Sequence, residues 1–153
     1  MIEDLINLLR EKHLRIATAE SCTGGMIAAA FTDIAGSSDV FERGFVTYSN
    51  ESKTEMLGVP SDLIASAGAV SEEVAARMAT GALAHSHADL AVSVTGIAGP
   101  GGGSPEKPVG TVWFGITARV GEVSTHLQLF AGDRAAVRTA ARDFALSLIR
   151  DLV

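Results

Sequence analysis

Apolar side chains recur with helical spacing at both ends of the chain. Ile2, Leu5, Ile6 and Leu9 lie on one face of an expected amphipathic helix over residues 2–12. Near the other end, Asp133 is a suitable helix cap, and the stripe after it comprises Val137, Ala141, Phe144, Ala145, Leu148, Ile149 and Leu152. The pattern therefore predicts a long helix at each end, with its apolar face turned toward a common core.

Between these helices, short apolar runs alternate with helical segments. Strands are predicted over 14–19, 45–48 and 90–94, and two β-rich runs over 111–120 and 122–130, split at Gly121, predict a hairpin. Helices are predicted over 26–33 and 50–57, and a further helix begins after Ser71. Because the elements mix along the whole chain without a linker or repeat, we expect one α/β domain over 1–153. Its architecture is a three-layer α/β/α sandwich with a mixed sheet of about five strands.

Composition and charge exclude several classes of function. The 153 residues carry a net charge of -6 and no Lys/Arg cluster, which disfavours nucleic-acid binding. The acidic start lacks the basic region of a signal peptide, and no apolar run is long enough to span a membrane. The single cysteine rules out an intrachain disulfide and suits a reducing compartment. We therefore expect a cytoplasmic protein with no membrane or nucleic-acid partner.

The segment Glu20-Ser21-Cys22-Thr23-Gly24-Gly25 joins a predicted strand to a predicted helix. A hydroxyl at this place faces free main-chain N–H groups, which can stabilise an oxyanion or bind phosphate. Ser21 is thus a candidate nucleophile. Two other interpretations stay open: Ser21 or Thr23 caps the helix, or Cys22 is the nucleophile.

A nucleophilic serine needs a base, and lysine is the better candidate for it. None of the four histidines lies in a loop of unusual composition, and no convincing metal-binding set is present. Of the three lysines, Lys12 ends a helix, Lys107 lies in a loop, and Lys53 follows the predicted strand over 45–48. If Lys53 is buried against the sheet, it can lose its proton near neutral pH and act as a base. The alternative is an ordinary exposed lysine on a helix.

Residues 95–104 form a second unusual loop, rich in glycine and starting at Thr95-Gly96. Glycine lets the main chain approach a ligand closely and leaves N–H groups free for a phosphate. The loop is neither a Walker loop nor a dinucleotide-binding fingerprint, because Gly-Lys-Ser/Thr is absent and a strand follows it. A flexible connection without a role remains the alternative.

Five segments together resemble the CinA C-terminal domain family of competence/damage-inducible proteins. They are residues 19–25 (AESCTGG), 45–50 (FVTYSN), 68–71 (GAVS), 95–100 (TGIAGP) and 107–112 (KPVGTV). The resemblance extends from about Leu14 to the last helix. It suggests the stand-alone form, without the larger N-terminal domain of the fused members.

The resemblance implies an amidase that converts nicotinamide mononucleotide to nicotinic acid mononucleotide and ammonia, in pyridine-nucleotide recycling. It implies Ser21 as the nucleophile, Lys53 as the base and Tyr48 as a group that orients Lys53 or relays a proton. The expected substrate-binding residues are Cys22, Thr23, Gly24, Gly25, Thr95, Gly96 and Gly99. No metal and no cofactor is expected. The expected assembly is a homodimer.

Two other classes of function are compatible with these residues. One is a nucleotide-binding accessory protein without catalysis, acting in competence or the response to DNA damage. The other is an assembly protein whose small-residue helices build an oligomer. Release of ammonia from nicotinamide mononucleotide distinguishes the amidase from both.

Overall fold

The computed structural model describes residues 2–153. The helices are α1 (Ile2–Glu11), α2 (Met26–Thr32), α3 (Asn50–Leu57), α4 (Ser61–Ala67), α5 (Glu72–Ala84) and α6 (Arg134–Leu152), with a 3-10 turn, η1 (Ser37–Asp39). The strands are β1 (Ile16–Glu20), β2 (Phe41–Val46), β3 (Leu90–Gly96), β4 (Thr111–Ala118) and β5 (Ser124–Leu129). Helices and strands are thus mixed along the whole chain, as the sequence pattern predicts.

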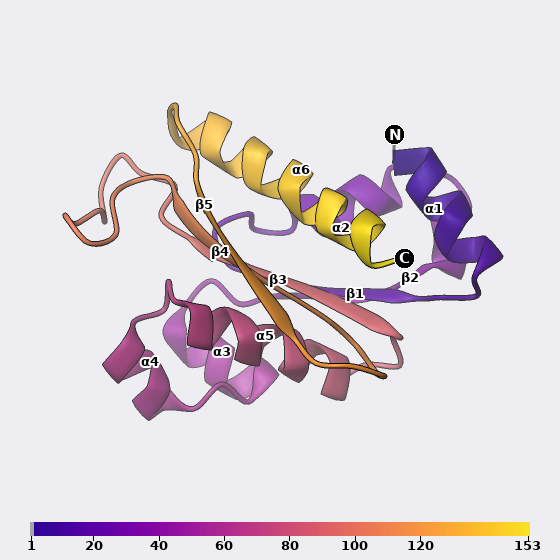
Figure 1. The fold of residues 1–153 in the computed structure, drawn as a ribbon, viewed down its shortest axis with the longest axis horizontal. Coiled ribbons are helices and arrows are strands. Elements are labelled where there is room, and N and C mark those ends of the chain that lie inside the picture. The colour runs from indigo at the N-terminus through magenta and orange to yellow at the C-terminus, as the bar shows by residue number, and fades with distance from the viewer. Residues whose placement is uncertain (1) are drawn as a thin grey trace.

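The strands form one mixed sheet in the order β2-β1-β3-β4-β5. β2, β1 and β3 run parallel, whereas β4 and β5 add as an antiparallel hairpin. Helices cover both faces: α1, α2 and α6 lie on one side, and α3, α4 and α5 on the other (Figure 1). The predicted three-layer α/β/α sandwich with a five-stranded mixed sheet is therefore confirmed.

Each layer of helices encloses its own apolar core. The core beneath α6 includes Phe31, Phe114 and Ile149, and the core beneath α5 includes Leu57 and Met78. β1 and β3 lie between the two cores and are buried on both faces, which explains why their sequences are almost continuously apolar. The interior rests largely on aliphatic side chains, in keeping with the low aromatic content of 5%.

The predicted helix caps are confirmed at two positions. The Ser71 hydroxyl accepts a hydrogen bond from the Val74 N–H, and the Asp133 carboxylate accepts one from the Ala136 N–H. One helix, α4, was not predicted. It comprises seven residues after Pro60 and buries only Ile64, so it has no apolar stripe that a sequence pattern could reveal.

The sheet brings the two unusual loops together. β1 and β3 are neighbours in parallel register, with Glu20 opposite Val94. Chain segments that leave their carboxyl ends therefore emerge side by side, and the Ser21 N–H donates to the Val94 carbonyl at 3.0 Å. The segment 21–25 and the loop after Thr95 thus meet at one edge, which is where α/β sheets bind ligands.

Candidate functional site

Ser21 and Lys53 lie in hydrogen-bond contact although 32 positions separate them. The Lys53 Nζ is 3.1 Å from the Ser21 Oγ. It also donates to the carbonyls of Thr47 at 2.8 Å and Tyr48 at 3.3 Å. The structure therefore unites a hydroxyl from the end of β1 with an amine from α3, and it fixes that amine with two main-chain carbonyls.

The burial of Lys53 follows from how α3 begins. The Ser49 hydroxyl caps this helix by accepting from the Ser52 N–H, so the next residue turns back toward the ends of the strands. Only 1% of the surface of Lys53 is exposed. The alternative of an exposed helix lysine is therefore wrong for this position.

Burial changes the protonation of both neighbours of the serine hydroxyl. It lowers the pKa of Lys53 from its ordinary value of 10.5, because a buried ammonium loses its hydration; a Cys22 thiolate would oppose this effect. Burial likewise raises the pKa of the Cys22 thiol to about 11. Near neutral pH the thiol therefore keeps its proton and is a poor nucleophile.

Neither Ser21 nor Thr23 caps α2, so that interpretation of the segment is wrong. Instead, the carboxylate of Glu20 accepts the N–H groups of Ile27 at 2.9 Å and Ala28 at 3.0 Å. The Thr23 hydroxyl also donates to this carboxylate, at 2.6 Å. The Ser21 hydroxyl is left free of any capping role and faces Lys53.

A cleft of about 320 Å³ opens over the Ser21–Lys53 pair. The predicted site residues that line it are Ser21, Cys22, Tyr48, Lys53, Thr95, Gly96 and Gly99. Four further lining residues, Ile97, Ala98, Gly101 and Gly102, belong to the glycine-rich loop over 95–104 that the sequence indicated as a candidate. Sequence reasoning assigned no role to the remaining ones, Asn50, Ala69, Val70 and Arg134. Thr23, Gly24 and Gly25 form the turn beneath and are not among the lining residues.

Thr95 connects the cleft to the loop between α4 and α5. Its hydroxyl donates to the Ala69 carbonyl at 2.8 Å and is almost fully buried. Gly96 follows, and a side chain there would collide with Val112. This Thr-Gly pair thus shapes the wall of the cleft through one side-chain hydrogen bond and one close approach of the main chain.

Tyr48 and Arg134 form the outer rim. The Tyr48 ring is 64% exposed, and its hydroxyl lies 3.2 Å from an Arg134 guanidinium nitrogen, while its carbonyl accepts from Lys53. Arg134 also donates to the Gly99 carbonyl at 2.8 Å. Arg134 is the first residue of α6, and its position directly after the Asp133 cap was the only sequence signal that could have located it.

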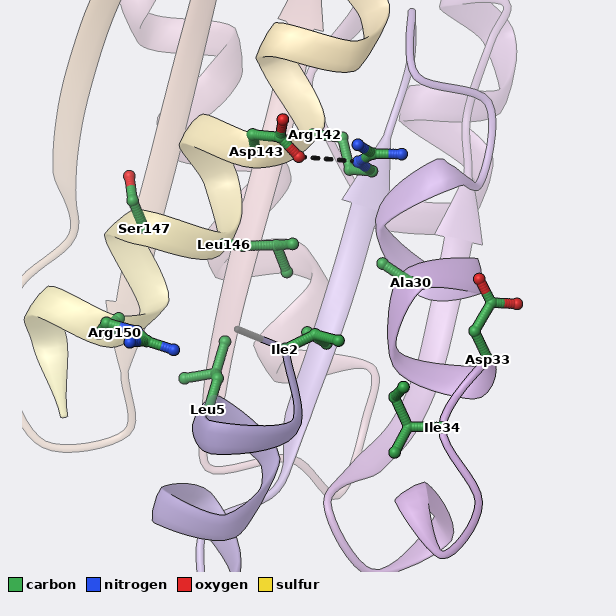
Figure 2. A pocket seen from close by; sticks show the side chains of 10 residues that line it. All are labelled: Ile2, Leu5, Ala30, Asp33, Ile34, Arg142, Asp143, Leu146, Ser147 and Arg150. Atoms are coloured by element: carbon green, nitrogen blue, oxygen red, sulfur yellow. Dashed lines mark hydrogen bonds and ion pairs between the residues drawn. The ribbon is translucent and has the colours of Figure 1, made fainter.

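A larger cleft of about 510 Å³ lies elsewhere, between α1, α6 and the segment 30–34 (Figure 2). Ile2, Leu5 and Leu146 give it an apolar wall, and Arg142 pairs with Asp143 at its rim. Its one hydroxyl, that of Ser147, donates to the Phe144 carbonyl and has no lysine or histidine beside it. The smaller cleft is therefore the better candidate for chemistry.

The described part of the chain lacks both a candidate metal site and a candidate membrane span. Among residues 2–153, no group of three or more His, Cys, Asp or Glu side chains is placed to hold a metal ion. No helix in the same range is both long enough and apolar enough to cross a membrane.

The fold and cleft define a three-layer α/β domain with a serine–lysine contact at the edge of its sheet. The sequence model of the CinA C-terminal domain matches residues 1–153. The chain therefore belongs to the CinA C-terminal domain family, as the sequence motifs indicated.

Relatives and solved structures agree with this assignment. The chain is 54% identical over 147 residues to nicotinamide-nucleotide amidohydrolase PncC of Escherichia coli K12, covering 96% of this chain and 89% of that protein. It is 59% identical over 138 residues to the protein of the same name from Enterobacter agglomerans, covering 90% and 84%. It also superimposes on the competence/damage inducible protein CihA from Agrobacterium tumefaciens with a TM-score of 0.92 and 49% identity, over 99% of this chain and 94% of that one.

Proposed function

We propose that residues 1–153 act as one amidase domain that hydrolyses nicotinamide mononucleotide to nicotinic acid mononucleotide and ammonia. The observation that carries the proposal is the 3.1 Å contact between the Lys53 Nζ and the Ser21 Oγ at the floor of the cleft. The names of the relatives from Escherichia coli and Enterobacter agglomerans support the choice of a nicotinamide nucleotide as substrate. The free thiol of Cys22 suits a cytoplasmic location.

The contacts of Lys53 support a role as general base. A neutral amine has two N–H donors and one lone pair, and the carbonyls of Thr47 and Tyr48 accept the two N–H groups. The lone pair then faces the Ser21 hydroxyl and takes its proton as the oxygen attacks the carboxamide carbon. The C–N bond breaks, ammonia leaves with a proton returned by Lys53, and water hydrolyses the resulting ester.

The cleft offers separate contacts for the two ends of the substrate. The carboxamide lies over Ser21, where the main-chain N–H group of Cys22 stabilises the oxyanion. The ribose and phosphate extend toward the glycine-rich loop and Arg134, which supplies the exposed cation at the rim. Tyr48 positions Lys53 through its carbonyl and Arg134 through its hydroxyl.

An ammonia assay on the purified protein tests this function directly. With nicotinamide mononucleotide we expect stoichiometric ammonia and nicotinic acid mononucleotide. With nicotinamide riboside, which lacks the phosphate, we expect a higher KM. Binding of the nucleotide without any ammonia release would reject the amidase and favour an accessory nucleotide-binding protein.

The activity should depend on pH through Lys53. Since burial lowers the pKa of this amine, the fraction able to accept a proton rises with pH, with a midpoint below 10.5. We therefore expect kcat/KM to increase with pH over the range in which the protein stays folded. A kcat/KM that falls as the pH rises from neutral would contradict a lysine base.

We also propose that the protein is a homodimer that pairs through β5. β5 contacts only β4 in the sheet, contains no Lys, Arg, Asp or Glu, and exposes Leu127 by 50% and Leu129 by 66%. The opposite edge, β2, carries Glu42 and Arg43, charges that discourage strand pairing. A two-fold axis would place two such uncharged edges against each other without like-charge repulsion.

Light scattering after size exclusion tests the homodimer. We expect twice the chain mass of 15.8 kDa for the wild type and 15.8 kDa for Leu127→Glu, because the new carboxylates would face each other across the axis. A wild-type mass of 15.8 kDa would reject the dimer, and an unchanged dimer in the variant would reject this interface.

A further inference from the structure

Glu20 is a buried acid beside the proposed nucleophile, and the reaction as described above does not use it. Only 1% of its surface is exposed, and no ion pair involves it within the described residues. Its two carboxylate oxygens accept three hydrogen bonds, from the Thr23 hydroxyl and from the N–H groups of Ile27 and Ala28. Burying a charge is unfavourable, so these three bonds must offset a substantial desolvation penalty.

Glu20 occupies the start of α2 and so determines which amides are left for a substrate. The Ile27 and Ala28 N–H groups point at the carboxylate, and the Met26 N–H donates to the Thr23 carbonyl. The start of α2 is therefore unavailable to an oxyanion, although the sequence pattern suggested free main-chain N–H groups there.

Within the turn itself, three main-chain N–H groups lack an oxygen acceptor among the described residues. The N–H groups of Ser21 and Gly24 are bonded, to the carbonyls of Val94 and Ser21. Those of Cys22, Thr23 and Gly25 find no oxygen acceptor within residues 2–153. Thr23 is fully buried and does not line the cleft, whereas Cys22 does. The Cys22 N–H, which directly follows the serine, is therefore the one suited to an oxyanion formed on it.

Arg138 holds the same turn from the side of α6. Its guanidinium donates to the Cys22 carbonyl at 3.0 Å and to the Thr23 carbonyl at 3.3 Å. Because a peptide group is planar, the bond from the Gly24 N–H to the Ser21 carbonyl within this turn fixes the direction of the Cys22 N–H. The turn is thus held by a carboxylate on one side and a guanidinium on the other.

We propose that Glu20 is a positioning residue for the deamidation: with Arg138, it holds the Ser21–Gly25 turn so that the Cys22 N–H binds the oxyanion. This inference rests on the proposed amidase function. It adds a specific role for two side chains that touch neither Lys53 nor the substrate in that mechanism. It also restricts the oxyanion site to the turn and excludes the helix start.

The test compares Glu20→Gln with a matched control, Glu42→Gln. Glutamine at position 20 must direct its NH₂ group at a hydroxyl or N–H that now donates to a carboxylate oxygen, so the turn shifts. The Glu42 side chain is also largely buried and accepts a main-chain N–H, that of His87. It lies near the start of β2, at the end of the parallel strands away from the cleft. Both variants are expected to lose thermal stability.

Kinetics separate positioning from general destabilisation. For Glu20→Gln we expect kcat for nicotinamide mononucleotide to fall about 10- to 100-fold with little change in KM, because the oxyanion forms only during reaction. Glu42→Gln should keep the wild-type kcat. Should Glu20→Gln fail to fold, Arg138→Gln changes a partly exposed side chain and should lower kcat in the same way. A wild-type kcat in the folded Glu20→Gln or in Arg138→Gln would overturn the proposal.

A second measurement does not depend on the natural substrate. A fluorophosphonate forms a bond from phosphorus to the Ser21 Oγ as the P–F bond breaks; the proton passes to Lys53 and fluoride leaves. Its phosphoryl oxygen occupies the oxyanion position, so intact-mass labelling should slow about 10- to 100-fold in Glu20→Gln and stay unchanged in Glu42→Gln. Labelling of the wild type without ammonia release would reject the amidase and leave this comparison valid. No labelling of the wild type at Ser21, or equal rates in both variants, would overturn the role of Glu20.

Discussion

Ser21→Ala is expected to lower kcat for ammonia release by about 10⁵-fold, the scale seen when a serine hydrolase loses its nucleophile. The fold should persist, because the Ser21 hydroxyl contacts Lys53 and takes no part in capping α2. The free energy of unfolding should change by about 1 kcal/mol or less, as for the loss of one hydrogen bond. Ammonia assays and urea unfolding on the same preparation measure both quantities.

A matched variant removes the remaining ambiguity about the nucleophile. Cys22→Ala deletes the neighbouring side chain and keeps its main-chain N–H, so it should retain most of the wild-type kcat. If Ser21→Ala kept substantial activity while Cys22→Ala lost it, the cysteine would be the nucleophile and the account would be wrong.

Lys53→Met is expected to lower kcat by about 10³-fold, the usual contribution of a general base, with little change in KM. Methionine has a similar length and no charge, so it should fit the buried site. Stability should respond in a pH-dependent way. Since folding lowers the pKa of Lys53, the unfolded chain carries more protons on this amine than the folded chain does between the folded pKa and 10.5.

The sign of that dependence is a test in itself. The wild type should gain free energy of unfolding relative to Lys53→Met as the pH rises from 7 toward 10.5, because releasing the Lys53 proton on folding costs less free energy at higher pH. Urea unfolding at pH 7 and pH 9 measures the difference. A wild type that loses stability relative to the variant over this range would indicate a buried ammonium rather than a neutral amine.

The sequence predicted the architecture because apolar periodicity is strong in this chain. The stripe of α6 and the continuous apolar run of β3 each have one good structural interpretation, and the Ser71 and Asp133 caps define where two helices begin. The α4 helix was missed since it buries one apolar residue and so has almost no amphipathic signal. Apolar periodicity reveals a helix only when the helix buries enough apolar side chains to form a stripe.

The functional site was harder to predict from residue types and apolar periodicity. Residue types alone left open whether Lys53 is a buried base or an exposed helix lysine, and only the parallel pairing of β1, β2 and β3 brings α3 to the serine. The resemblance to the family motifs supplied that assignment before the geometry did. Glu20 was read as part of a turn, because no local pattern shows that a side chain at the end of β1 reaches two amides seven and eight residues later.

The protonation of Lys53 is the measurement closest to the central claim. The chain has three lysines, so a ¹³C-lysine NMR titration gives three side-chain signals, and the one missing in Lys53→Met belongs to Lys53. The account predicts that this signal reports a pKa below 10.5, because burial disfavours the charged amine. A Lys53 signal that reports a pKa of 10.5 or higher would contradict a neutral amine beside the Ser21 hydroxyl.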